Sequence, residues 1–446
     1  MNSLTLWINP QLPHANMVAH LVQNYAQWWG FTVLLRHHSD PSWILALENR
    51  SVSIPQSSQH LIPQNVDKSS ITVQNVEFML PHPALPDPQT AWDWNAISVD
   101  LLTFLGGQLW RAEEYEPELF DHATTADHRG FLGDSHDFFD IPLVDLWMRA
   151  IFEYLLQKDI NPPLYKGKNG AFWLSFDVDS LRKWKLRSVI KHFFLLPSYA
   201  IALQTRVWIK LLIEALQAHF PHKDPWFTIP QMLKGSAGLR ATFFWLGHKR
   251  DHLAERYDLA LPEYRDLPRQ VSEQGHYNGW HGSPLHAESL EDLTAEMQNW
   301  QKVVQKAPLI SRQHFLRIFP GQTLNYLDKL GVKFDSSMGF NTRPGFRCGS
   351  AIPHKWWCFA TQKALDIVEI PLILGDWNLH NPQKFDPEKS LQKALKYAQW
   401  VKLGGGIFSL DFHEIYFSQD YPGHGEFFSV LMQELQAQDW LAWSPL

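Results

Sequence analysis

Two aspartates and a histidine-rich loop are the residues of this sequence whose types and spacing could do chemistry. Asp177 and Asp179 stand two positions apart at the end of the mostly apolar stretch 172–176. Further along the chain, the loop 275–286 contains three histidines. Because carboxylates and imidazoles together are typical ligands of divalent transition metals, these two stretches indicate a metal site.

A buried strand over 172–176 would position the two carboxylates. In α/β sheets and barrels, chemistry is usually placed at the C-terminal ends of the strands. Residues two apart on an extended strand project to the same side, so Asp177 and Asp179 are expected to face one cleft. The sequence also allows a simpler interpretation, a strand that stops at an Asp-rich turn.

The rest of the chain alternates strands with helices after residue 166. Strands are expected at 240–246, 277–280, 309–312, 332–335, 366–370 and 407–412, and helices at 262–274, 289–306, 322–330 and 387–402. Repeated units of this kind are typical of a barrel or a wound sheet.

The part before residue 166 lacks a catalytic signature. Short strands are expected at 5–8, 31–35 and 71–76, a Pro-rich linker at 81–88, and helices at 100–115 and from Pro142 onward. We therefore predict an N-terminal α/β accessory region over 1–90 and a helical connecting region over 91–165.

Composition restricts the class of protein. A chain of 446 residues with 45% hydrophobic and 19% charged residues is expected to form a globular protein of more than one domain. The net charge of −7 argues against nucleic-acid binding. Two cysteines, Cys348 and Cys358, and an N-terminus without a signal-peptide pattern favour a cytoplasmic location. No apolar run is long enough for a transmembrane segment.

An unusual basic insertion follows the aspartate pair at 181–223. It contains eight Lys or Arg residues against one Glu, interleaved with apolar runs, and 207–216 has helical periodicity. Two interpretations remain open. Its helices could pack on the domain with a solvated basic face, or they could lie on the anionic inner face of a membrane as a peripheral contact.

Four stretches, in order, resemble motifs of the polysaccharide deacetylase superfamily, carbohydrate esterase family 4. They are Ser175–Asp179, Ala241–Phe244, Gly275–His281 and Ser409–His413. A closer resemblance, over roughly 95–420, is to a bacterial branch with an extra N-terminal region, and it is carried by 312–317, 334–340, 343–349 and 369–372. The resemblance implies a distorted (β/α) barrel over 166–446, with fewer than eight regular units.

The same resemblance implies that the protein hydrolyses an N-acetyl amide on a sugar with one divalent metal. Asp177 would be the general base, Asp179 and His281 would bind the metal, and His413 would protonate the leaving amine. Zinc is the first expectation for a mixed His/Asp site, although cobalt, nickel or iron would suit the same ligands.

The third metal ligand is less clear. Members of the family usually place a second histidine four residues after the first, whereas here His286 follows His281 by five residues, with Pro284 between them. We favour His286 as the third ligand and keep His314 as the alternative.

Three further residues are candidates for substrate binding. Arg347 could bind a substrate carboxylate or orient Asp177, or it could form a structural ion pair. Asp376 and Trp377 could line the sugar site, or they could be a turn residue and a core residue.

Three functions follow from these residues. The first is the removal of an N-acetyl group from a sugar in a glycan or in a nucleotide- or lipid-linked glycan precursor. The second is hydrolysis of a non-sugar amide on the same barrel, since a fold does not determine a substrate. The third is a catalytically inactive glycan-binding relative. Retention of both Asp177 and His413 argues against the third, because binding alone requires neither a base nor an acid.

Overall fold

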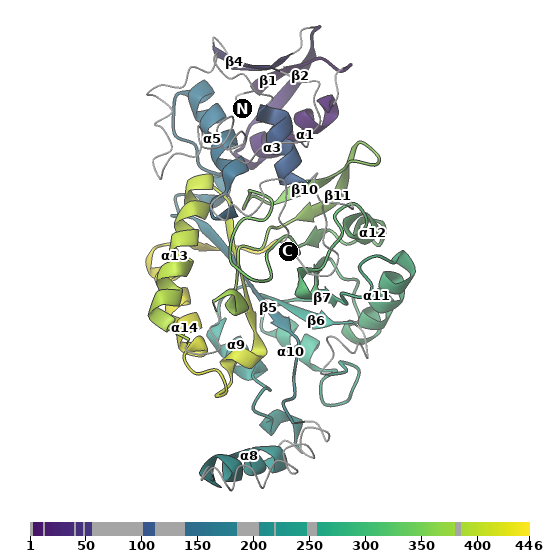
Figure 1. Ribbon diagram of the computed structural model, residues 1–446, viewed down its shortest axis with the longest axis vertical. Coiled ribbons are helices and arrows are strands. Elements are labelled where there is room, and N and C mark those ends of the chain that lie inside the picture. Colours follow the sequence, from purple (N-terminus) through teal and green to yellow (C-terminus); the bar gives the residue numbers. More distant parts are fainter. Residues whose placement is uncertain are drawn as a thin grey trace, which may run out of the picture.

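The computed structural model shows a mixed α/β protein with one sheet of four strands and one of ten (Figure 1). It describes residues 3–11, 14–39, 42–47, 50–55, 101–111, 139–184, 205–217, 220–247, 257–379 and 385–446. The strand expected at 71–76 and the linker expected at 81–88 lie outside these residues.

The ten-stranded sheet carries the candidate site. Its strand order is β10-β11-β9-β8-β7-β6-β5-β13-β12, and β14 also pairs with β5. All paired strands are parallel except β10 and β11. The strands are β5 (Ala171–Val178), β6 (Thr242–Leu246), β7 (Tyr277–Gly282), β8 (Ile310–Gln313), β9 (Phe334–Asp335), β10 (His354–Cys358), β11 (Lys363–Glu369), β12 (Leu374–Gly375), β13 (Ile407–His413) and β14 (Leu441–Ala442).

Strand β5 is buried on both faces, as expected for a central strand of a parallel sheet. Its even-numbered residues, such as Phe172 and Phe176, belong to the main hydrophobic core. Trp173, on the opposite face, packs in a smaller core with Phe244 and Ile310. We call this second side the inner face of the sheet. Because β5 alternates strictly, Asp177 extends from the inner face as well.

Helices flank this sheet on two sides. In Figure 1, α13 and α14 lie side by side along one flank, and α11 and α12 lie on the other. Ser289 and Asp386 cap α11 and α13 by accepting hydrogen bonds from the Asp292 and Lys389 amides. The helices are α9 (Ile229–Gly235), α10 (Leu267–Glu273), α11 (Leu290–Val304), α12 (Thr323–Lys329), α13 (Pro387–Gly404) and α14 (His424–Ala437), with short 3₁₀ turns η4 (Pro163–Tyr165), η5 (Pro221–Lys223), η6 (His314–Leu316), η7 (Asp376–Asn378) and η8 (Glu414–Phe417).

The N-terminal part forms the four-stranded sheet, in the order β2-β1-β3-β4. Its elements are β1 (Ser3–Ile8), α1 (Ala15–Trp28), β2 (Thr32–His37), β3 (Ser42–Leu47) and β4 (Arg50–Pro55), and α3 (Leu101–Leu109) and α5 (Leu143–Leu156) follow. A buried network joins this part to the larger sheet. The hydroxyls of Tyr25 and Ser350 each donate a 2.6 Å hydrogen bond to Asp145 Oδ1. Burial raises the pKa of Asp145 to about 7.

Helix α8 (Thr205–Gln217) lies apart from the body of the protein at one end of the molecule (Figure 1). The helix expected from the periodicity of 207–216 is therefore confirmed. None of the residues 209–216 is buried, and Lys210 is exposed. Within the described ranges, no helix is both long and apolar enough to cross a membrane.

Most expected strands are present, with shifted boundaries. The helix expected from Pro262 begins only at Leu267, after a series of turns. Strand β7 continues beyond Trp280 to Gly282, so His281 lies on the strand rather than after it. The two edge strands of this sheet are β10 and β12, and a closed barrel would require them to pair. No such pair is seen in the described part of the chain. The structure therefore shows a parallel α/β sheet, and closure into a barrel stays a hypothesis.

Candidate active site

Polar residues occupy the C-terminal ends of the central strands on the inner face. Along β5, Ser175 and Asp177 follow Trp173 at intervals of two residues. On the neighbouring strand β13, Asp411 pairs in register with Ser175, and His413 with Asp177. The parallel register therefore brings carboxylates and an imidazole from two distant parts of the sequence to one level of the sheet.

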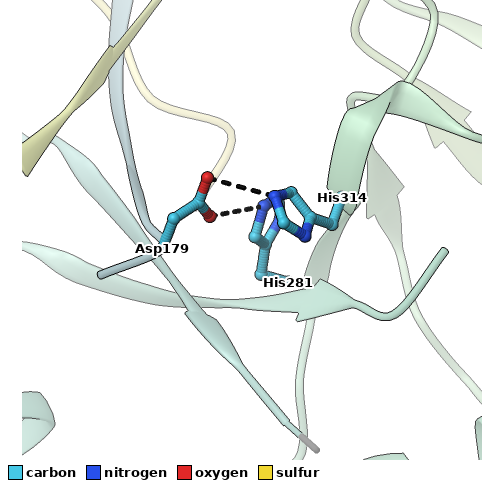
Figure 2. A group of neighbouring side chains, drawn as sticks. All are labelled: Asp179, His281 and His314. Carbon is cyan, nitrogen blue, oxygen red and sulfur yellow. Dashed lines mark hydrogen bonds and ion pairs between the residues drawn. The ribbon is translucent and has the colours of Figure 1, made fainter. Parts of the chain in front are cut away.

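Asp179, His281 and His314 form a compact group with the ligand types of a metal site (Figure 2). Asp179 Oδ1 lies 3.3 Å from His281 Nε2, and Asp179 Oδ2 lies 3.1 Å from His314 Nε2. The two imidazoles approach the same carboxylate from β7 and from the turn after β8. One atom from each of the three residues lies within 4.8 Å of the other two.

The protonation of His281 fits metal binding. Its Nδ1 lies 2.9 Å from the carbonyl oxygen of Arg312, which can only accept, so Nδ1 carries the proton. In the neutral ring, Nε2 then has a free lone pair directed at Asp179. Both Asp179 Oδ1 and His281 Nε2 are buried and make no hydrogen bond within the described part of the chain. A divalent cation would satisfy both of these atoms.

His314 reaches the group through an unusual turn. It begins η6, directly after β8, and the next two residues, Phe315 and Leu316, have φ values of 58° and 52°. Such values are rare for bulky side chains and cost roughly 1–3 kcal/mol each. The ring of Phe315 stacks on His314 with 4.0 Å between ring centroids. Backbone strain is thus concentrated in the two residues that directly follow His314.

His286, the ligand favoured from the sequence, is not part of this group. Its Nδ1 lies 2.6 Å from Oε2 of the buried Glu296. Glu296 also accepts hydrogen bonds from the Ser283 amide and the Trp280 indole, so it fixes the loop after β7. The geometry therefore favours the alternative ligand, His314. The second histidine of the loop thus contacts a structural carboxylate.

Arg312 is fully buried beneath the site. Its Nη1 lies 2.8 Å from Asp177 Oδ1 and 2.5 Å from Asp411 Oδ1. The guanidinium lies over the ring of Phe244, 4.5 Å from its centroid. Burial alone would raise the pKa of Asp177, but the surrounding positive charge, to which Arg312 contributes most, outweighs it and lowers that pKa. Asp177 is thus held ionised, as a base requires.

His413 is held by a second carboxylate. Its Nδ1 lies 2.8 Å from Asp376 Oδ1, and its backbone amide donates a 2.6 Å hydrogen bond to Asp376 Oδ2. Nε2 of His413 points toward Asp179 Oδ2, at 3.5 Å. Burial would lower the pKa of His413, but the charges of Asp376 and Asp179 prevail and raise it well above its usual value. The imidazole is therefore a ready proton donor.

The raised pKa of His413 predicts a specific titration. In chelator-treated protein with carbon-13-labelled histidine, the His413 signal should titrate well above the usual pKa of about 6.5. The Asp376→Asn variant should lower the pKa of His413. In wild type, the raised pKa means that the native state binds this proton more tightly than the unfolded chain does. The resulting stability is complete below pH of about 6.5 and is lost as pH rises through the folded pKa. An unchanged pKa in Asp376→Asn would contradict this assignment.

The three residues proposed for substrate binding have different positions. Arg347 is only 1% exposed, and its Nη1 donates to the Gly339 carbonyl at 3.4 Å, while Asp177 is oriented by Arg312 instead. Asp376 is 1% exposed and serves His413. Trp377 is partly exposed, and its ring is perpendicular to that of His413, with 5.0 Å between ring centroids. Of the three, Trp377 is the one that is partly exposed.

The sequence-based prediction missed the roles of Arg312 and Asp411. A signal for both exists. The aspartate pair at the end of β5 has one residue between its members, and the same spacing separates Arg312 from His314 and Asp411 from His413. Residues two apart on a strand share a face, so the two polar residues of each pair are expected on the same side of the sheet. The second member of each pair lies at or just beyond the C-terminal end of its strand, where the site is.

Gly279 on β7 allows close packing beneath His281. A Cβ added at this position would lie 2.4 Å from Phe244 Cδ1. The Gly279→Ala variant should therefore lower the free energy of unfolding by about 1–3 kcal/mol, as overpacked cores do. Urea unfolding of the variant beside wild type measures this, and an unchanged midpoint and slope would show that Phe244 can move away without cost.

Comparison with known proteins gives structural similarity only. No protein-family model matches the chain. No curated protein matches it either. A candidate polysaccharide deacetylase from Mycobacterium smegmatis is 18% identical, with a TM-score of 0.41, covering 62% of this chain and 87% of its own. A polysaccharide deacetylase from Bacillus cereus is 13% identical, with a TM-score of 0.29, covering 62% and 93%.

A third similar structure is that of the allantoinase PuuE, at 11% identity and a TM-score of 0.40, covering 64% of this chain and 90% of its own. Polysaccharide deacetylases, the family that the motifs resemble, are thus among the solved structures similar to this chain.

Proposed function

We propose that this protein is a metal-dependent hydrolase that removes an N-acetyl group from a sugar in a glycan or a glycan precursor. One observation carries the proposal: a carboxylate and an imidazole, which could act as base and acid, flank a group of metal-ligand type. Asp177 Oδ2 lies 3.6 Å from His281 Nε2, and His413 Nε2 lies 3.5 Å from Asp179 Oδ2. Hydrolysis of an amide requires both of these proton transfers.

Asp179, His281 and His314 would hold the metal. Zinc is the first expectation for one carboxylate and two imidazoles, although cobalt, nickel or iron would suit the same ligands. When bound, a divalent cation polarises the amide carbonyl and makes water more acidic. The side chain of Asp179 is 21% exposed, whereas that of His281 is 1% exposed, so the group opens on the side of Asp179.

Asp177 is proposed to take the proton of the attacking water. Arg312 binds Oδ1 of this carboxylate, and Oδ2 faces the ligand group. As the proton moves to Asp177, the water oxygen bonds to the carbonyl carbon. Arg312 is a positioning residue in this account, because it touches Asp177 and not the reacting atoms.

His413 is proposed to protonate the leaving nitrogen. Asp376 accepts from Nδ1, so the proton that moves is the one on Nε2, which faces the site. When this proton reaches the nitrogen, the C–N bond breaks, and acetate and a free amine are formed. Without it the sugar would have to leave as an amine anion, which is far too basic.

An acetate-release assay tests this function. The metal-loaded protein is incubated with a panel of N-acetylated amino sugars and their oligomers, beside His413→Ala. Release by wild type and its loss in the variant would support the proposal. Metal-loaded protein that releases acetate from none of these sugars, but from a simple N-acetyl amide, would favour the non-sugar hydrolase. Metal-loaded protein that binds these glycans without turnover would favour the inactive relative.

A further inference from the structure

The basic insertion presents an apolar row to solvent. Ile209, Ile213 and Leu216 on α8 are 46%, 48% and 67% exposed, and Phe220 just beyond the helix is 51% exposed. The first three are four and three residues apart, so they lie along one side of the helix. An apolar row of this kind is costly to leave in water and marks a contact surface.

The insertion is fixed firmly where it meets the body. The backbone amides of Lys183 and Trp184, on the entering segment, donate to the buried carboxylate of Asp224, on the returning segment. Lys183 Nζ also lies 3.1 Å from Glu214 of α8 and 2.7 Å from Asp420 of the body. These contacts connect α8 to the main structure through Glu214, which lies on the helix itself. The apolar row takes no part in these contacts and stays exposed to solvent.

The charge beside this row indicates an anionic partner. The segment 181–223 has a net charge of +7 in a chain of net charge −7, so the remainder carries −14. Lys210 on α8 is exposed, and Lys223 Nζ lies 5.1 Å above the ring centroid of the exposed Phe220. Two cations, Lys210 and Lys223, are thus placed next to the apolar residues.

We propose that α8 and Phe220 dock on an anionic lipid surface. Apolar residues along one side of a helix, with cations beside them, are the features by which helices insert into the headgroup region of a membrane. The helix has 13 residues, so it would lie in the interface and not cross it. The insertion leaves the sheet directly after Asp179, at the strand end that carries the candidate site. The inference does not depend on the proposed function.

Vesicle flotation of the full chain tests this docking. Wild type should float with vesicles of phosphatidylcholine mixed with phosphatidylglycerol, less with phosphatidylcholine alone, and less again in high salt. Ile213→Glu should reduce binding by about tenfold or more, because a charge would enter the apolar contact. Leu403→Glu is the matched control, since Leu403 is 47% exposed on α13 and undergoes the same substitution. It should bind as wild type does.

Three results would overturn the proposal. The first is wild type that does not float with anionic vesicles, and the second is equal binding of Ile213→Glu and Leu403→Glu. The third is a wild-type dimer in solution that Ile213→Glu dissociates while vesicle binding is absent, which would make the row a contact between copies of this chain. Circular dichroism confirms that each variant folds, and the double charge reversal Lys210→Glu, Lys223→Glu tests the same docking without touching an apolar residue.

Discussion

Replacing Arg312 with methionine should lower the free energy of unfolding by about 3–5 kcal/mol, the range seen when one partner of a buried ion pair is removed. Arg312 is fully buried and contacts both Asp177 and Asp411. Without it, the buried carboxylate of Asp177 loses the charge that contributes most to its low pKa. Urea unfolding at neutral pH, in the presence of a chelator, measures the loss.

Asp411→Asn is the matched control for this variant. Asp411 binds the same Nη1 of Arg312, but burial and the charge of Asp177 raise its pKa to about 8. Because the carboxyl is already largely protonated near neutral pH, an amide should replace it at a cost below about 1.5 kcal/mol. A loss in Arg312→Met no larger than that in Asp411→Asn would contradict the account of this cluster.

Replacing Asp177 with asparagine should reduce kcat/KM for acetate release by about 10²–10⁴-fold, the usual contribution of a general base. Asparagine has nearly the same shape and can still accept from Arg312, but it cannot take a proton from water. Metal content should stay at the wild-type level, since Asp177 belongs with Asp411 and His413 to a different group of possible ligands from the one proposed to bind the metal. Steady-state kinetics on the substrate identified in the acetate assay measures this loss.

Two controls separate this effect from structural damage. Trp377→Phe, at the partly exposed ring beside His413, should raise KM more than it lowers kcat if the ring lines the sugar site. Asp411→Asn should change the rate much less than Asp177→Asn does. An Asp177→Asn enzyme that keeps its metal and most of its activity would exclude Asp177 as the base.

The sequence was sufficient to predict the strands that carry the site. An apolar run ending in two aspartates predicted β5, and the structure shows this strand buried on both faces with the carboxylate of Asp177 on its inner face. Alternation with helices predicted the parallel order around it. These features are local, because they depend on residue spacing along one strand, which strand geometry determines directly.

The third ligand could not be predicted in the same way. His286 and His314 both follow a strand of the sheet, and their spacing in the sequence does not show where each side chain points. The outcome depends on two contacts from elsewhere. Glu296 on α11 binds His286, and a turn with positive φ at Phe315 directs His314 inward. Both are properties of the packed structure rather than of a local pattern.

The partner of Asp177 was missed for a similar reason. Arg347 and Arg312 were both present in recognisable motifs, but only the pairing of β5, β6, β7 and β8 shows which guanidinium lies beneath the site. Helix α1 was also not expected, since the short strands around it dominated the pattern of the first ninety residues. Contacts between residues far apart in the sequence decide both cases.

The central claim is that Asp179, His281 and His314 form a metal centre, and metal analysis of purified protein tests it most directly. Wild type should contain about one equivalent of a divalent transition metal, and so should His286→Ala, whose side chain binds Glu296 instead. His281→Ala and His314→Ala should each lose it. Wild type that stays empty after incubation with zinc, or His314→Ala that keeps its metal while His286→Ala loses it, would contradict the account.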